Sequence, residues 1–270
     1  MSATEPQAGS PALATMLLEA MKRLGSSVLP FVVVILIWQF ASLFFPRFLF
    51  PSLIDVFWRC LEIFSSGTMF ADVLSTILRI LAGLAGAFVI GGLLALLMVR
   101  SRAVDKFLAP ILTLFQGIPA LSWVVFAIIW FHGVEFRIFF IMVMTTLPAF
   151  TFQVLGALRA MSKDLMEMVF SFRPTRIKLF RVMIAPAILP DILTAWKVNL
   201  GNASRVVVVA ELVGATGGVG YQLQQQQLFD MAGALAWTLQ LVFFVLIVQG
   251  ALTLIENTAF RYRAVSERAI

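Results

Sequence analysis

The side chains best suited to chemistry lie inside an apolar stretch, residues 186–213, that is long enough to cross a bilayer. They are two cations and two amides: Lys197, Arg205, Asn199 and Asn202. A charged side chain at the bilayer centre costs about 2.5–3.5 kcal/mol on insertion scales, so cations here favour a polar lining. Lys197, Gly201 and Arg205 follow one another at intervals of four residues, which places them on one helix face about 12 Å long. We expect this face to line a path across the membrane and to attract an anion.

These charges could instead have structural roles. Lys197 could extend to the cytoplasmic interface, and Arg205 could pair with a buried carboxylate such as Glu211 of the partner subunit. Arg79 and Glu211 both fall near the outer leaflet and could pair with each other. For that pair, an ion pair that fixes two helices is favoured over a gate.

Composition defines the class of protein. The chain is 61% hydrophobic and 13% charged, whereas a soluble domain is roughly half apolar and a quarter charged. We therefore predict an all-α membrane protein that crosses the bilayer several times. The net charge of +6 lies beside apolar stretches, so it does not indicate nucleic-acid binding. The sequence holds one cysteine, which excludes an internal disulfide, and no G-x-x-x-x-G-K-S/T loop for ATP.

Apolar stretches predict about six spans after an N-terminal segment, residues 1–27, made of a polar tail and an amphipathic helix in the membrane surface. The remaining residues, 28–270, form the transmembrane domain. Its third span contains Pro110, Gly117 and Pro119 and should be bent or split. The predicted spans are residues 28–45, 74–99, 107–131, 138–158, 186–213 and 232–255.

The distribution of Lys and Arg predicts the orientation of these spans. Alternate connectors carry fourteen Lys and Arg residues, and the opposite connectors carry three. Connectors rich in Lys and Arg stay on the cytoplasmic side. Both termini and the loop at residues 160–185 are therefore expected in the cytoplasm.

That loop is amphipathic and basic. Leu165, Met168, Val169 and Phe172 recur at helical spacing, and the pair Arg173-Pro174 interrupts the pattern. We predict two short helices with a turn between them. An apolar helix face on the cytoplasmic side needs a partner, and a soluble protein with a groove would provide one.

The same loop contains Glu167-Met168-Val169, Arg173, Met183, Ala185-Pro186 and Pro190. With this spacing it resembles the EAA loop of the membrane subunits of bacterial ABC importers. In that family a glycine makes the turn at the position of Arg173, and here we expect Pro174 to enforce it. Further motifs are similar to the permeases of sulfonate, taurine, nitrate and thiamine-precursor importers: Pro51-Ser52, Thr76, Arg79, Gly83, Pro119-Ala120-Leu121, Trp130-Phe131, Gly133, Ala210-Glu211 and Gly217-Gly218-Val219-Gly220-Tyr221.

The resemblance implies a multi-pass protein of the bacterial inner membrane that works as a homodimer and is not an enzyme. A periplasmic binding protein would deliver the solute, and two ATP-binding cassette subunits would hold ATP and Mg, with no cofactor on this chain. The residues implied in coupling are Glu167, Met168, Val169, Phe172, Arg173, Pro174 and Pro186.

The solute is the open point. The intramembrane cations favour sulfonate, nitrate, bicarbonate or an organic or aromatic acid, and a neutral pyrimidine-type vitamin precursor is the alternative. A channel or secondary transporter would have no use for a cytoplasmic docking helix. An integral membrane enzyme would need convergent acids and histidines, whereas the sequence has a single histidine.

Overall fold

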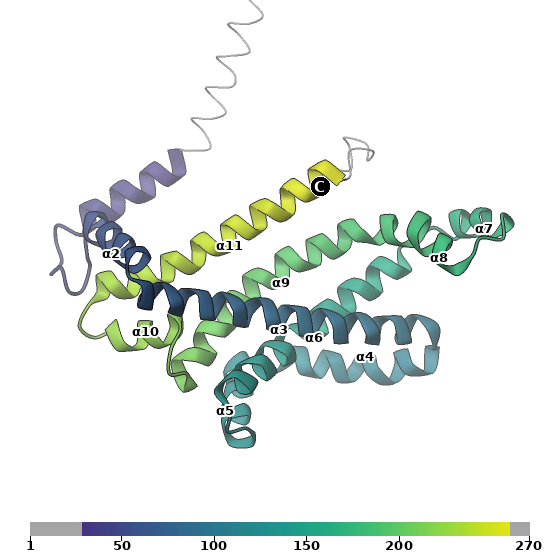
Figure 1. Cartoon of the computed structure of the whole chain (residues 1–270), viewed down its shortest axis with the longest axis horizontal. Helices are drawn as coiled ribbons and strands as arrows, with labels where there is room; N and C mark the ends of the chain where they lie inside the picture. The colour runs from purple at the N-terminus through teal and green to yellow at the C-terminus, as the bar shows by residue number, and fades with distance from the viewer. Residues whose placement is uncertain (1–28, 260–270) are drawn as a thin grey trace, which may run out of the picture.

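The computed structural model describes residues 29–259, and these form a bundle of helices. Most of the long helices run side by side along the bundle (Figure 1). After the helix Leu29–Ala41, the elements are α2 (Leu53–Ser65), α3 (Gly67–Arg100), α4 (Arg102–Gly117), α5 (Ala120–Trp130), α6 (Val134–Arg159), α7 (Lys163–Ser171), α8 (Arg176–Leu179), the π-helical turn η1 (Phe180–Ile184), α9 (Ala185–Gly214), α10 (Val219–Gln226) and α11 (Met231–Ala259).

Within the described residues, four helical segments are long and apolar enough to cross a membrane: Gly67–Arg100, Val134–Arg159, Ile177–Gly214 and Met231–Thr258. They confirm the predicted spans in these regions, although α3 and α6 extend beyond the predicted ends. The predicted first span coincides with the shorter apolar helix Leu29–Ala41, which begins at the first described residue. The predicted segment at residues 1–27 and the three C-terminal arginines lie outside the described residues.

The predicted break in the third span is present. Helices α4 and α5 meet at an angle of 97°, and with this pair counted as one span the described residues hold five candidate spans. Ile118 and Pro119 are extended between the two helices. Pro110, by contrast, is accommodated inside α4. The proline at the bend lacks an N–H and cannot continue the hydrogen-bond ladder of α4.

The centre of the bundle is formed by α3, α6 and α9. Glycines of α3 allow α6 to approach closely, since a Cβ at Gly83 would overlap the Cβ of Met142. Small residues have this function in lipid, where close packing replaces the hydrophobic effect between helices. Phe88, Phe150 and Trp196 bring their rings together, with centroids 5.5–5.7 Å apart, where the three helices meet.

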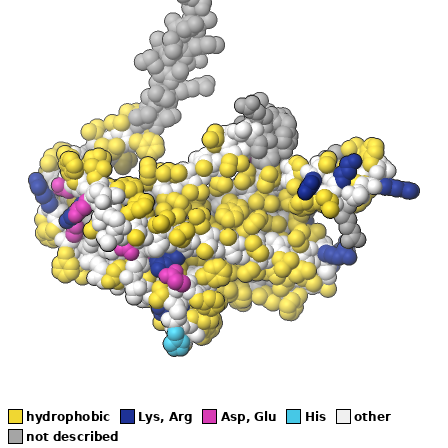
Figure 2. Space-filling model, in the orientation of Figure 1, with side chains coloured by type: hydrophobic (Ala, Val, Ile, Leu, Met, Phe, Trp, Pro, Cys, Tyr) yellow, Lys and Arg dark blue, Asp and Glu magenta, His cyan; other side chains and the backbone are white. Residues whose placement is uncertain are grey.

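The two ends of the bundle differ in chemistry. Helices α7 and α8 lie at one end, beyond the last residues of α6, and α2 and α10 lie at the other (Figure 1). Lys and Arg side chains gather around α7 and α8, and hydrophobic side chains cover the length between the ends (Figure 2). We refer to the α7–α8 end as the loop end and, from the orientation expected from the Lys and Arg distribution, to the α2–α10 end as the outer end.

Candidate functional site

The structure separates the four polar residues of α9. Asn199 is buried and donates from Nδ2 to Gln153 Oε1 of α6 (2.7 Å) and to the carbonyl of Ala195 (2.8 Å). It therefore faces the centre of the bundle, on the opposite side of α9 from Lys197 and Arg205. Asn202 is half-buried. The predicted cluster is thus divided between two faces of one helix.

Lys197 has an acidic partner. Its Nζ lies 2.6 Å from Glu256 Oε2 on α11, and both side chains are partly buried. Sequence reasoning missed Glu256, because it sits near the end of the last span with nothing in the pattern to connect it to α9. The positive charge of Lys197 is therefore neutralised within the subunit, by a partner that the sequence analysis did not predict.

Arg205 is the exposed cation of α9. Its Nε donates to the carbonyl of Gly201 (3.1 Å), and among residues 29–259 no acidic side chain lies within ion-pair distance of it. Glu211 is not available to it, since that carboxylate is fully buried in another network. Arg205 lies nine residues before the end of α9, well inside the span.

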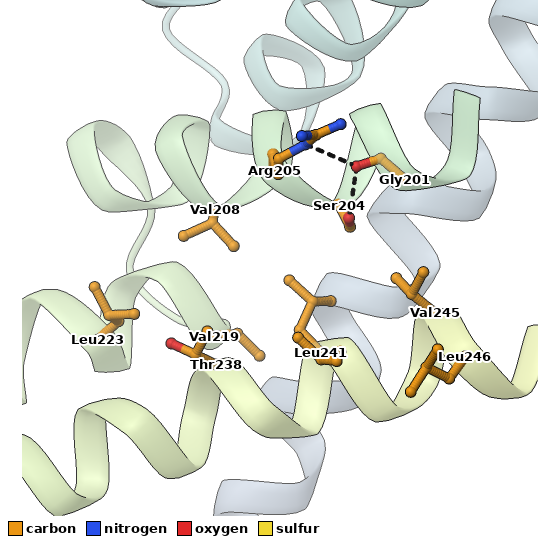
Figure 3. A pocket seen from close by; sticks show the side chains of 11 residues that line it. Gly201, Ser204, Arg205, Val208, Val219, Leu223, Thr238, Leu241, Val245 and Leu246 are labelled. Atoms are coloured by element: carbon orange, nitrogen blue, oxygen red, sulfur yellow. Dashed lines mark hydrogen bonds between the residues drawn. The ribbon is translucent and has the colours of Figure 1, made fainter. Parts of the chain in front are cut away.

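A cavity of about 500 Å³ opens beside Arg205, between α9, α10 and α11. Its lining is mostly aliphatic, and the hydroxyls of Ser204 and Thr238 donate to carbonyls of their own helices. Figure 3 shows the Arg205 guanidinium directed away from Leu241 and Val245, so only the stem of the side chain borders the cavity. The charged end of Arg205 therefore lies on the exposed surface of α9, outside the cavity.

At the outer end, Arg79 and Glu211 form an ion pair between α3 and α9. Arg79 Nη1 lies 2.7 Å from Glu211 Oε1, and Glu211 is 0% exposed. Thr76 donates its hydroxyl to both oxygens of Glu211, and the backbone N–H of Gly220 donates to Oε2 (2.8 Å). A buried carboxylate is stable only with partners of this kind, because leaving water is costly for a charge.

The same network binds the glycine-rich turn between α9 and α10. Arg79 also donates to the carbonyl of Gly217 (2.9 Å), and Asp72 accepts from the N–H of Gly218 (2.9 Å) and from Gln222 Nε2 (2.6 Å). Gly218 has φ +111°, a conformation that other residues rarely adopt. The glycine-rich turn is therefore held by two α3 residues: Arg79, which the sequence analysis had paired with Glu211, and Asp72, which it had not singled out.

Glu135 is a further member of the network around Arg79 and Glu211, and the sequence analysis did not predict it. It binds the remaining edge of Arg79 through Nε (2.9 Å) and Nη2 (2.5 Å). Its side chain is 71% exposed, whereas that of Arg79 is 12% exposed. A bidentate fork of this kind fixes the plane of the guanidinium. Glu135 thus covers Arg79 on the solvent side.

At the loop end, α7 and α8 are two short helices joined by a turn at Arg173-Pro174, as predicted. Arg173 donates its N–H to the carbonyl of Phe170 (2.9 Å) and has φ +47°. Arg173 therefore adopts the left-handed conformation that favours glycine, so the turn is made by Arg173 and not by Pro174 alone. Among L-residues this conformation costs roughly 1–2 kcal/mol.

The apolar residues of this segment have few contacts. Phe172 is 78% exposed, and Met168, Phe170 and Ile177 are also exposed. Glu167 is exposed, and Val169, Pro174 and Pro186 are half-buried. The π-helical turn η1 then connects α8 to α9 without a break, so α7 is attached to the α9 span through α8 and η1. This is an exposed apolar surface attached to a spanning helix.

These features define a multi-pass membrane protein with an exposed apolar loop at one end of the bundle. A family model described as "Binding-protein-dependent transport system inner membrane component" matches residues 87–261, more than half of the chain. The chain therefore belongs to this family.

Several proteins similar to this chain are named as transport permeases. The formylaminopyrimidine transport permease protein ThiX of Halalkalibacterium halodurans is 26% identical, over 86% of this chain and 94% of its own length. The riboflavin transport system permease protein RibX of Chloroflexus aurantiacus is 29% identical, over 82% of each chain. The taurine transport system permease protein TauC of Escherichia coli is 26% identical, over 60% of this chain and 58% of its own.

Among solved structures, a chain of the MetNI methionine ABC transporter in an inward facing form has a TM-score of 0.58. It is 20% identical and covers 76% of this chain and 95% of its own. This shows a common fold. With the family match, it identifies the protein as the permease subunit of an ABC importer, an inner membrane component and not an enzyme. The family implies a binding protein and an ATPase as partners.

Proposed function

We propose that two copies of this subunit form the path by which a small anionic solute, such as a sulfonate, nitrate, bicarbonate or organic acid, enters the cell. A periplasmic binding protein delivers the solute to the outer end. Two partner ATPases bind ATP and Mg at the loop end and drive the change of conformation. In this orientation both termini are cytoplasmic, as the distribution of Lys and Arg predicts.

The observation that carries the proposal is Arg205. It is an exposed guanidinium inside a spanning helix, without an acidic partner among residues 29–259. Facing lipid, such a charge would cost several kcal/mol, so a position beside a polar path explains it. A guanidinium binds sulfonates and carboxylates through paired hydrogen bonds. Lys197 and Asn199 no longer support the proposal, because Glu256 and Gln153 engage them.

The test begins with the solute. A thermal-shift screen of the cognate binding protein with sulfonates, nitrate, bicarbonate, aromatic acids and neutral pyrimidines identifies it. Uptake of that compound is then measured in proteoliposomes with the complete transporter. Arg205→Ala should lower uptake about tenfold or more, since a charge-assisted hydrogen bond contributes roughly 1.5–3 kcal/mol.

Two matched variants complete this test. Arg205→Lys should retain part of the uptake, and Val198→Ala, another exposed position of α9, should retain all of it. ATPase activity without solute should be unchanged in each. A neutral solute, or normal uptake by Arg205→Ala, would overturn the anion path and leave the importer class untouched.

We further propose that α7 is the helix that couples the permease to its ATPase. Met168 and Val169 of α7, with Phe172 directly after it, supply an apolar surface, and Glu167 supplies a charge near the middle of the helix. Arg173 and Pro174 set the turn, and Pro186 lies in the first turn of α9. An amphipathic helix that fits a groove of another protein uses this pattern.

Glu167→Lys tests this role. We expect ATP hydrolysis by the assembled complex to continue while solute uptake falls severalfold or more, because the reversed charge disturbs the fit of α7 in the ATPase groove. Asp191→Lys makes the same charge reversal at an exposed position on α9 and should leave the ratio of uptake to hydrolysis unchanged. An unchanged ratio in Glu167→Lys would contradict the role.

A further inference from the structure

Helix α2 has three distinct faces. Val56, Cys60 and Ile63 lie on one face and are wholly or half buried. Asp55, Arg59 and Glu62 form a second, charged face. The third face, opposite the first, is apolar and exposed. It consists of Ile54, Phe57, Trp58, Leu61 and Phe64.

The buried face contacts α11 in its first turns, after the residue at which that helix begins. Gln240 donates to the carbonyl of Cys60 (3.1 Å), and the thiol of Cys60 lies 3.9 Å from the carbonyl of Ala236. On the charged face, Arg59 pairs with Asp230, the residue just before α11 (2.9 Å), and with Glu62 (2.7 Å). Ala236 follows Asp230 by six positions, which corresponds to a distance of about 9 Å along the axis of α11. The charged face therefore lies at the beginning of the span, and the buried face lies against the first turns of the span itself.

The exposed apolar face continues onto α3. The rings of Phe64 and Phe70 are in contact, with centroids 6.1 Å apart. From Phe70, the exposed residues Leu74, Leu78 and Leu81 continue at helical spacing along the spanning helix α3. The apolar face of α2 and the membrane-facing stripe of α3 are thus one continuous surface at the outer end.

We propose that α2 is an interfacial helix whose Ile54–Phe64 face lies in the lipid at the boundary between headgroups and acyl chains of the outer leaflet. Helices of this kind insert an apolar face by roughly 5–10 Å, with charged residues toward water. Trp58, 64% exposed, is the residue type enriched at that level. With thirteen residues, α2 is too short to span the bilayer. It thereby fixes the depth of α3 and α11, the two spans that it contacts.

Depth-dependent quenching tests this proposal in the complete transporter. In a Cys60→Ala background, Trp58→Cys and the control Glu62→Cys are labelled with an environment-sensitive fluorophore. The transporter is reconstituted in phosphatidylcholine–phosphatidylglycerol vesicles that carry nitroxide at acyl carbon 5 or 12. Leu61→Cys, on the same face as Trp58, replaces Trp58→Cys if that variant does not assemble.

We expect the carbon-5 lipid to quench the label at position 58 at least twice as strongly as the label at position 62. It should also quench it more than the carbon-12 lipid does. Aqueous iodide should show the reverse preference between the two positions. Equal lipid quenching at both positions would overturn the proposal. Shielding of position 58 from lipid, with a disulfide between two copies at this position, would assign the face to the dimer instead.

Discussion

The outer end and the loop end of the bundle differ in how far the contacts of their side chains are completed within the subunit. At the outer end, Glu211 is fully buried and its oxygens receive hydrogen bonds from a hydroxyl, a guanidinium and a backbone amide. At the loop end, α7 exposes large apolar side chains, and Arg173 holds an unfavourable backbone conformation. The polar groups of the outer end are paired within the subunit, whereas the loop end leaves apolar side chains exposed, on the surface that we propose for the ATPase.

The difference indicates where stability resides and where function depends on a partner. Substitutions in the outer network should change the stability of the isolated subunit. Substitutions in the loop should change that stability little and should change coupling in the assembled transporter. Three predictions on stability test this contrast, in order of expected size.

The largest effect is expected at Glu211. Glu211→Gln removes the buried carboxylate from Arg79, which keeps its exposed partner Glu135. The new amide has a single oxygen to accept the hydrogen bonds that Thr76, Arg79 and Gly220 donate to Glu211. Breaking a buried ion pair costs about 3–5 kcal/mol. We expect a loss of this size in the free energy of unfolding, measured by denaturation of the purified subunit in mixed micelles.

Glu135→Gln is the matched control. It removes a carboxylate from the same guanidinium, but one that is 71% exposed, and exposed pairs contribute about 0–1 kcal/mol. If both variants lost equal stability, burial would not be the reason for the strength of the outer network.

An intermediate effect is expected at the α3–α6 contact. Gly83→Ala places a Cβ where it overlaps the Cβ of Met142, so the helices must move apart. Overpacking costs typically about 1–3 kcal/mol. Gly92→Ala, in the same helix but with no atom within 4 Å of the new Cβ, should be neutral or slightly stabilising. Unfolding of both variants in mixed micelles gives the comparison, and equal losses would show that Gly83 matters for reasons other than close approach.

The smallest effect is expected at the loop. Arg173→Gly relieves the strain of φ +47° and should stabilise the turn by about 1 kcal/mol. Hydrogen exchange of residues 164–181 should slow, and the unfolding midpoint of the subunit should change little. Ser171→Gly, at the end of α7, should have the opposite effect on exchange, since glycine weakens a helix. Faster exchange in Arg173→Gly would show that the arginine side chain is needed to hold the turn.

Much of the fold could be predicted from the sequence, because a helix that crosses lipid must be long and apolar. Long apolar stretches predicted four of the spans, and Gly117 and Pro119 predicted the break between α4 and α5. The turn at Arg173-Pro174 followed from the conformational limits of proline and the residue before it. Helix boundaries were less accurate. Helix α3, for example, begins at Gly67, seven residues before the predicted span at residues 74–99.

The pairing of side chains between helices could not be predicted in the same way. Lys197 and Arg205 look alike in sequence, yet one meets Glu256 on α11 and the other meets no acid in the described part of the chain. Asn199 was placed with the cations by its position in the chain, but the rotation of α9 turns it toward Gln153. Such outcomes depend on helix rotation and neighbour choice, which hydrophobic periodicity does not determine.

The ion pair between Lys197 and Glu256 has a mechanical consequence. It joins the middle of α9 to the C-terminal part of α11, and α10 with its short turns joins the end of α9 to the start of α11. Two helices that are joined at two separate points cannot slide independently along each other. If α7 transmits the motion of the ATPase to α9, as proposed, these two links make α9 and α11 move together, and the Arg59–Asp230 ion pair moves α2 with them.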